Sequence, residues 1–159
     1  MAEKGGVYMA EKGRYRAGAI GRTGQGNFGH GLHLPYREID QIDFIAVSDP
    51  DEAGRKKAAE ETGATQTYAD FQDMLEHEDL DIVSVCTWHL LHPAPTIAAA
   101  EAGVQGVICE KPMAIGMRDA DRMVDACEKS GTKLVISHQR RFTPGWEKVR
   151  ELMQQGAIG

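Results

Sequence analysis

Short apolar segments that alternate with helix-like segments constrain the fold of this chain more than any other feature of its sequence. Five segments have the length and composition of buried strands: 15–21, 44–48, 82–87, 104–109 and 133–137. Helix-like segments fall between and after them: 51–62, a short one after Asp70, 94–102, 117–129 and 146–155. This alternation predicts an α/β fold, a doubly wound parallel sheet with helices on both faces.

Residues at the ends of these segments support the prediction. Gly63, Gly103 and Gly131 each follow a predicted helix, where glycine commonly ends one. Asp70 can cap the short helix that follows it. The run 82–87 is too continuously apolar for an edge strand, so we expect it near the centre of the sheet.

Length and composition limit the classes of protein to consider. A chain of 159 residues with 42% hydrophobic content predicts one domain, which we place at 14–159. Met1–Gly5 is repeated at Met9–Gly13, and we expect residues 1–13 to be a flexible leader. A formal charge of -6 without a basic block argues against a nucleic-acid partner.

Three widely spaced cysteines, Cys86, Cys109 and Cys127, form no Cys-x-x-Cys pair. They are typical of buried free thiols in a cytoplasmic protein. No histidine has zinc-like spacing to a cysteine, so we expect no metal. No apolar run has the length of a signal peptide core or a membrane span.

A glycine-rich turn, Gly21–Gly31, leads from the first strand into a predicted helix that ends near Ile39. Such a turn lets backbone N–H groups approach a pyrophosphate at a helix N-terminus. Gly24, Gly26 and Gly29 fit Gly-x-Gly-x-x-Gly literally, whereas Gly21, Gly24 and Gly26 fit it with one extra residue. We favour the second register because the tight turn must follow the strand directly, although an ordinary glycine-rich loop stays open.

Asp49 ends the second predicted strand, about twenty residues beyond the glycines. A carboxylate there can accept hydrogen bonds from the adenosine ribose, and it should repel a 2'-phosphate. NAD is therefore favoured, with NADP as the alternative because Arg22 could offset that repulsion. The competing interpretation of Asp49 is a helix cap ahead of Pro50.

Glu110-Lys111-Pro112 directly follows a buried strand, so it lies at the sheet edge where doubly wound folds bind ligands. Lys111 there could orient a substrate hydroxyl and transfer its proton. The competing interpretation is a solvated ion pair at a strand end.

In order and spacing, several motifs together resemble the Gfo/Idh/MocA-like oxidoreductases, over Arg16 to Gly159. The motifs are the glycine turn with His30, Val47–Pro50, Thr87–His92, Ala102-Gly103, Glu110–Pro112, His138–Phe142 and Gly156–Gly159. The resemblance implies a Rossmann-type cofactor domain for NAD(P) in an oxidoreductase that acts on a CH–OH group of a sugar or polyol. Family members commonly have proline and asparagine where this chain has Trp88 and His89.

The resemblance also implies roles for individual residues. The residues that would contact the cofactor are Gly21, Arg22, Thr23, Gly24, Gln25, Gly26, Asp49, Thr87, His89, His92, Glu110, Lys111, Gln139 and Arg141. Lys111 would also reach the substrate as the catalytic residue. His89 and His92 could equally belong to a polar loop surface.

Family members usually continue into a second α/β domain that supplies most of the substrate pocket. We expect that domain to be absent here, which predicts a truncated protein with little turnover, exposed apolar surface and self-association into a homo-oligomer. Two other functions stay open: a non-catalytic dinucleotide-binding module or subunit, and a fold that binds S-adenosylmethionine.

Overall fold

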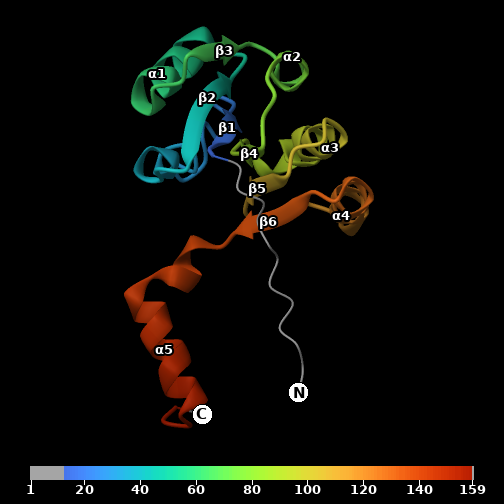
Figure 1. Cartoon of the computed structure of the whole chain (residues 1–159). Helices are drawn as coiled ribbons and strands as arrows, with labels where there is room; N and C mark the ends of the chain where they lie inside the picture. Colours follow the sequence, from blue (N-terminus) through green and yellow to red (C-terminus); the bar gives the residue numbers. More distant parts are fainter. Residues whose placement is uncertain (1–12, 159) are drawn as a thin grey trace.

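A six-stranded parallel sheet organises residues 13–158, the part of the chain that the computed structural model describes (Figure 1). The strands are β1 (Tyr15–Ile20), β2 (Ile42–Ser48), β3 (Gln66–Tyr68), β4 (Ile82–Val85), β5 (Gly106–Glu110) and β6 (Lys133–Ser137). Their order is β3-β2-β1-β4-β5-β6. The chain adds β2 and β3 on one side of β1, then crosses over and adds β4, β5 and β6 on the other side. This order is that of dinucleotide-binding domains, and the predicted fold is confirmed. The predicted leader lies outside the described residues, apart from its last residue.

Five α-helices accompany the sheet: α1 (Glu52–Thr62), α2 (Phe71–His77), α3 (Pro93–Glu101), α4 (Met117–Ser130) and α5 (Pro144–Gln154). The Asp70 side chain accepts a hydrogen bond from the Gln72 N–H and caps α2, as predicted. Gly63 and Gly131 end α1 and α4 in the left-handed conformation, with φ of 77° and 76°. Strand β3 was not predicted because its three residues, none of them buried, carry no apolar pattern.

The predicted helix between the glycine turn and Ile39 is wrong. Turns occupy this stretch and lead to a short 3-10 helix, η1 (Pro35–Glu38). Gly24, Gly26, Gly29 and Gly31 all have positive φ, a conformation that a right-handed helix excludes. The helix dipole that usually faces the pyrophosphate is therefore missing from this turn.

Apolar side chains form a core on each face of the sheet. On one face, Met74 from α2 and Met123 from α4 are fully buried against β4 and β5. On the other face, Ala58 from α1 and Phe28 from the glycine turn pack near β1 and β2. Burying one such methionine stabilises the fold by roughly 1.5–3 kcal/mol.

The three cysteines are free thiols and all are buried. Burial raises the pKa of the Cys109 thiol to about 12, and it also raises the pKa values of Cys86 and Cys127. These thiols stay protonated near neutral pH and are poor nucleophiles. Within 13–158 no helix has the length and apolarity needed to cross a membrane.

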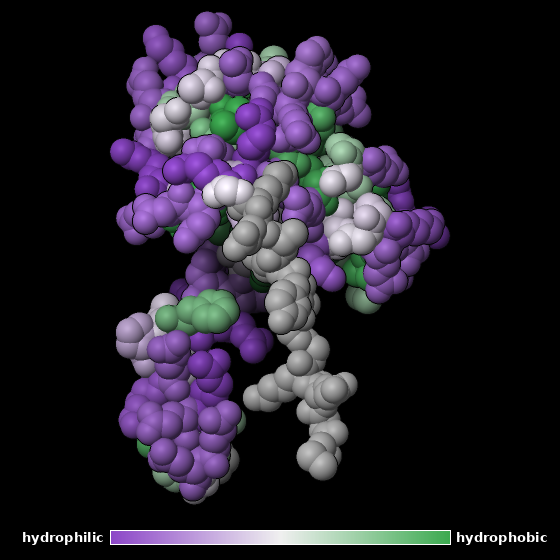
Figure 2. All heavy atoms as spheres, viewed as in Figure 1, coloured by the Kyte–Doolittle hydropathy of each residue, from purple (hydrophilic) through white to green (hydrophobic). Residues whose placement is uncertain are grey.

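Helix α5 extends away from the sheet and packs chiefly against η3 (Gln139–Phe142) (Figure 1). Phe142, Trp146 and Met153 are all exposed on this extension. The space-filling view shows mostly hydrophilic residues over the body, with apolar patches between them and on the segment leading to α5 (Figure 2).

Candidate functional site

The glycine turn crosses the carboxyl edge of the sheet at the point where the strand order reverses. Gly21 follows β1 directly, and a Cβ there would lie 2.6 Å from the Phe28 ring. Gly26 has φ of 93°, and a Cβ would lie 2.5 Å from the backbone nitrogen of Trp88. The Trp88 N–H also donates to the carbonyl of Gln25 at 2.9 Å. The turn is therefore held against the end of β4, and Gly21 and Gly26 tolerate no side chain.

Other side chains of the turn bond within it. Arg22 Nε donates to Gln25 Oε1 at 2.7 Å, and the Gly24 N–H donates to Asn27 Oδ1 at 2.9 Å. Among the described residues, no protein atom accepts the N–H groups of Gly26 and Phe28. These two donors remain available to an anion.

Asp49 lies at the end of β2 with its side chain fully buried. Its Oδ2 accepts hydrogen bonds from the Thr23 N–H and hydroxyl, both at 2.8 Å. Its Oδ1 accepts the Asp51 N–H at 2.9 Å. The carboxylate therefore links the glycine turn to the end of β2. A ribose hydroxyl could bond to Oδ2 only by displacing the Thr23 hydroxyl.

A largely apolar cavity of about 220 Å³ opens beside the turn, at the ends of β1, β2 and β4. Its walls come from the turn, the loop before α2 and the segment leading into α3: Ile20, Gly21, Arg22, Ser48, Pro50, Ala69, Asp70, Phe71, Thr87, Leu90, Leu91, Ala94 and Pro95. The buried Thr87 Oγ1 has no hydrogen-bond partner among the described residues. A buried polar atom without a partner next to a cavity fits a ligand that supplies one.

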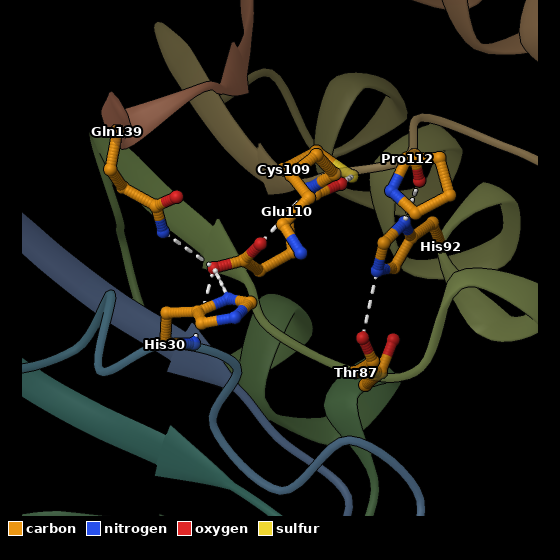
Figure 3. Close-up of polar contacts among 8 residues, drawn as sticks. His30, Thr87, His92, Cys109, Glu110, Pro112 and Gln139 are labelled. Carbon is orange, nitrogen blue, oxygen red and sulfur yellow. Dashed lines mark hydrogen bonds and ion pairs between the residues drawn. The ribbon is translucent and has the colours of Figure 1, made fainter. Parts of the chain in front are cut away.

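Glu110 joins three separate segments at the carboxyl end of β5 (Figure 3). Its Oε1 accepts the His30 N–H, lies 3.1 Å from His30 Nδ1 and accepts Gln139 Nε2 at 3.0 Å. Its Oε2 accepts the Lys111 N–H at 3.0 Å. Burial alone would raise the pKa of the Glu110 carboxyl, but the hydrogen bonds from His30 and Lys111 bring that pKa below its usual value. Glu110 is therefore an ionised, buried acceptor.

The two histidines predicted near the cofactor have different surroundings. His92 is 1% exposed, with Nε2 2.7 Å from the Thr87 carbonyl and Nδ1 2.9 Å from the Pro112 carbonyl (Figure 3). Its ring therefore links the segments that follow β4 and β5. Because His92 is buried, the alternative of a polar loop surface is wrong for it. His89 is half-buried, and its ring contacts Trp88 edge-on at 5.2 Å between centroids.

A second cavity of about 530 Å³ lies at the ends of β5 and β6, next to residues that hydrogen-bond to Glu110. It is lined by His30, Lys111, His138, Gln139, Arg140 and Arg141. The structure thus brings the predicted residues Lys111, Gln139 and Arg141 together. Sequence reasoning assigned no role to His30, His138 and Arg140, although the basic run at 138–141 was a signal for the last two.

No group of three or more His, Cys, Asp or Glu side chains arranged to hold a metal ion occurs within 13–158.

Comparison with known proteins assigns the family. The model of the Gfo/Idh/MocA family, described as an oxidoreductase family with an NAD-binding Rossmann fold, matches residues 19–138. The chain belongs to this family.

Relatives and solved structures agree with that assignment. The chain is 36% identical to a D-apiose dehydrogenase of Paraburkholderia graminis, over 80% of this chain and 34% of that protein. It is 32% identical to a myo-inositol 2-dehydrogenase of Thermotoga maritima, over 88% of this chain and 42% of that protein. A WlbA dehydrogenase from Bordetella pertussis, solved in complex with NADH and UDP-GlcNAcA, is similar with a TM-score of 0.78 and 29% identity, over 92% of this chain and 43% of that one. The chain spans less than half the length of each of these relatives.

Proposed function

We propose that this chain binds NAD at the carboxyl edge of its sheet, as the cofactor-binding part of an oxidoreductase acting on a CH–OH group of a sugar or polyol. The observation that carries the proposal is the meeting of the glycine turn and the unpartnered Thr87 hydroxyl at one apolar cavity, where the strand order reverses. Asp49 lies at the end of β2, between the cavity residues Ser48 and Pro50. Ligands of doubly wound folds bind at that position.

The residues present fit this cofactor. The apolar cavity suits an adenine ring. The Asp49 carboxylate, at the end of β2, would suit the ribose once the Thr23 hydroxyl is displaced. The free N–H groups of Gly26 and Phe28 suit the pyrophosphate without a helix dipole. Glu110 and Lys111 lie further along the same edge, where the nicotinamide would reach.

Bound NAD+ would accept the hydride from the substrate carbon. As the C–H bond breaks with its electron pair, the hydroxyl proton must leave, and the Lys111 side chain would orient that hydroxyl and take part in the proton transfer. Through its four hydrogen bonds, Glu110 would fix the positions of the Lys111 backbone, of His30 in the turn and of Gln139. The names of the relatives, D-apiose dehydrogenase and myo-inositol 2-dehydrogenase, support a sugar or polyol as the substrate.

Calorimetric titration with NAD+ and separately with NADP+ tests the proposal. We expect saturable binding that prefers NAD+ and weakens in Asp49→Asn, while Asp43→Asn at the far end of β2 binds as the wild type does. Because Asp49→Asn could disturb the turn, Thr87→Val serves as a second variant. Thr87→Val removes a hydroxyl that has no protein partner within 13–158. A lower affinity of this variant for NAD+ would therefore indicate a lost contact with the cofactor. Absence of binding, or tighter binding of S-adenosylmethionine, would refute the proposal.

A further inference from the structure

The cavity at the ends of β5 and β6 concentrates positive charge in an acidic protein. The whole chain has a formal charge of -6, yet Lys111, Arg140 and Arg141 all line this one cavity. The one carboxylate behind it, Glu110, is 2% exposed and already accepts hydrogen bonds from neighbouring groups. Its charge is therefore directed at His30, Gln139 and the Lys111 N–H.

The basic side chains of this cavity have no acceptors of their own. Within 13–158, no hydrogen bond or ion pair engages the side chains of Lys111, Arg140 and Arg141. Other arginines do bind protein oxygens: Arg16 pairs with Glu78 at 2.9 Å, and Arg37 donates to the Glu61 carbonyl at 2.6 Å. The 3-10 turn of η3 thus presents Arg140 and Arg141 as available donors.

The balance of donors and acceptors favours one class of ligand. Arginine and lysine offer donors only, and Gln139 already gives its Nε2 to Glu110. A neutral sugar brings hydroxyl groups that both donate and accept, and the donors among them find no acceptor on Lys111, Arg140 or Arg141. A carboxylate or phosphate brings acceptors only, and its bonds to guanidinium groups are charge-assisted.

The cavity also has the size and position for a substrate group. Its volume of about 530 Å³ lies within the range of roughly 300–1,000 Å³ found for small-molecule sites. Lys111, to which proton transfer is assigned above, forms part of its wall. Arg140 and Arg141 also line an adjoining cavity with Trp146 and Arg150, which extends the basic surface.

We propose that this cavity, which we call the basic cavity, binds the anionic group of the substrate, so that the substrate is a sugar acid or a sugar phosphate. The assignment rests on the proposed function and specifies its substrate class. Arg140 and Arg141 would bind the anionic group, and Lys111 would lie near the substrate hydroxyl that loses its proton.

Direct binding to the whole chain without cofactor tests this proposal. We would titrate it with sodium D-glucuronate, glucose 6-phosphate and D-glucose in low salt, following the Nε–H signals of the arginines by NMR. We expect one or both anionic sugars to shift the signals of Arg140 and Arg141, and D-glucose to leave them unchanged. The stronger of the two anions then identifies carboxylate or phosphate as the recognised group.

A charge variant and a matched control sharpen the test. Arg141→Gln should weaken the bound anion by about fivefold, a modest factor because the site is open to solvent. Arg118→Gln, an exposed arginine on α4, should bind as the wild type does. Raising the salt concentration should weaken binding in the wild type.

Three results would overturn the proposal: equal binding of D-glucose, equal binding by Arg141→Gln, or binding of acetate and inorganic phosphate as tight as that of the sugar anions. These measurements omit NAD, so their failure is distinct from a failure of the NAD titration, which reads the other cavity.

Discussion

Replacing Glu110 by alanine should remove four hydrogen bonds at once, because the Glu110 carboxylate accepts from His30, Gln139 and Lys111. A hydrogen bond to a charged group contributes roughly 1.5–3 kcal/mol, and a buried donor left unsatisfied costs about 1–3 kcal/mol. The four bonds are not additive. The His30 side chain is 61% exposed, so water can replace part of what is lost. We therefore expect the free energy of unfolding to fall by about 2–3 kcal/mol.

Glu110→Gln separates the shape of the side chain from its charge. Its carbonyl can replace Oε1 and keep three of the four contacts, whereas its amide would face the Lys111 N–H, donor against donor. We expect a loss of about 1 kcal/mol for this variant.

Urea unfolding at pH 7.5, followed by circular dichroism, measures both losses, and the thermal midpoint of Glu110→Ala should fall by about 5–10 °C. Glu128→Ala is the control: Glu128 is an exposed residue of α4 whose side chain makes no hydrogen bond or ion pair within 13–158, and its replacement should change stability by less than about 0.5 kcal/mol. If Glu110→Ala matched this control, Glu110 would not be holding the three segments together.

Two further predictions concern the glycine turn and the helix beside it. Gly26→Ala should destabilise the protein by about 2 kcal/mol or more, because φ is 93° and the new Cβ would meet the Trp88 backbone at 2.5 Å. Gly63→Ala, at φ of 77° with nothing within 4 Å, should lose only about 1 kcal/mol, and urea unfolding of the pair checks this. Burial lowers the pKa of His33 more than its contact with Glu61 raises it, so the folded state disfavours the charged ring. The associated stability is complete above about pH 6.5 and is lost as pH falls from there toward the folded-state pKa; unfolding at pH 7.5 and 5.5 should show this loss in the wild type and a smaller one in His33→Gln.

Local chemistry was enough to predict most of the elements. The end glycines Gly63 and Gly131 and the cap Asp70 act through their own backbone or that of the next turn, so sequence spacing carries the information. The predicted helix after the glycine turn is wrong, because the turns continue beyond Gly31 and only the short η1 follows them. Residue spacing alone did not distinguish these turns from a helix.

The sequence by itself determined the alternation of strands and helices, the carboxyl edge as the place for Asp49, Glu110 and Lys111, and the family. Only the tertiary structure decided how these side chains are used. It turned the Asp49 carboxylate onto Thr23, 26 positions away, and brought His30 within bonding distance of Glu110, 80 positions away. It also gathered the arginines of η3 around Lys111 in one cavity. Side-chain partners across such separations depend on strand order and on the path of the turns, and residue spacing along a chain contains neither.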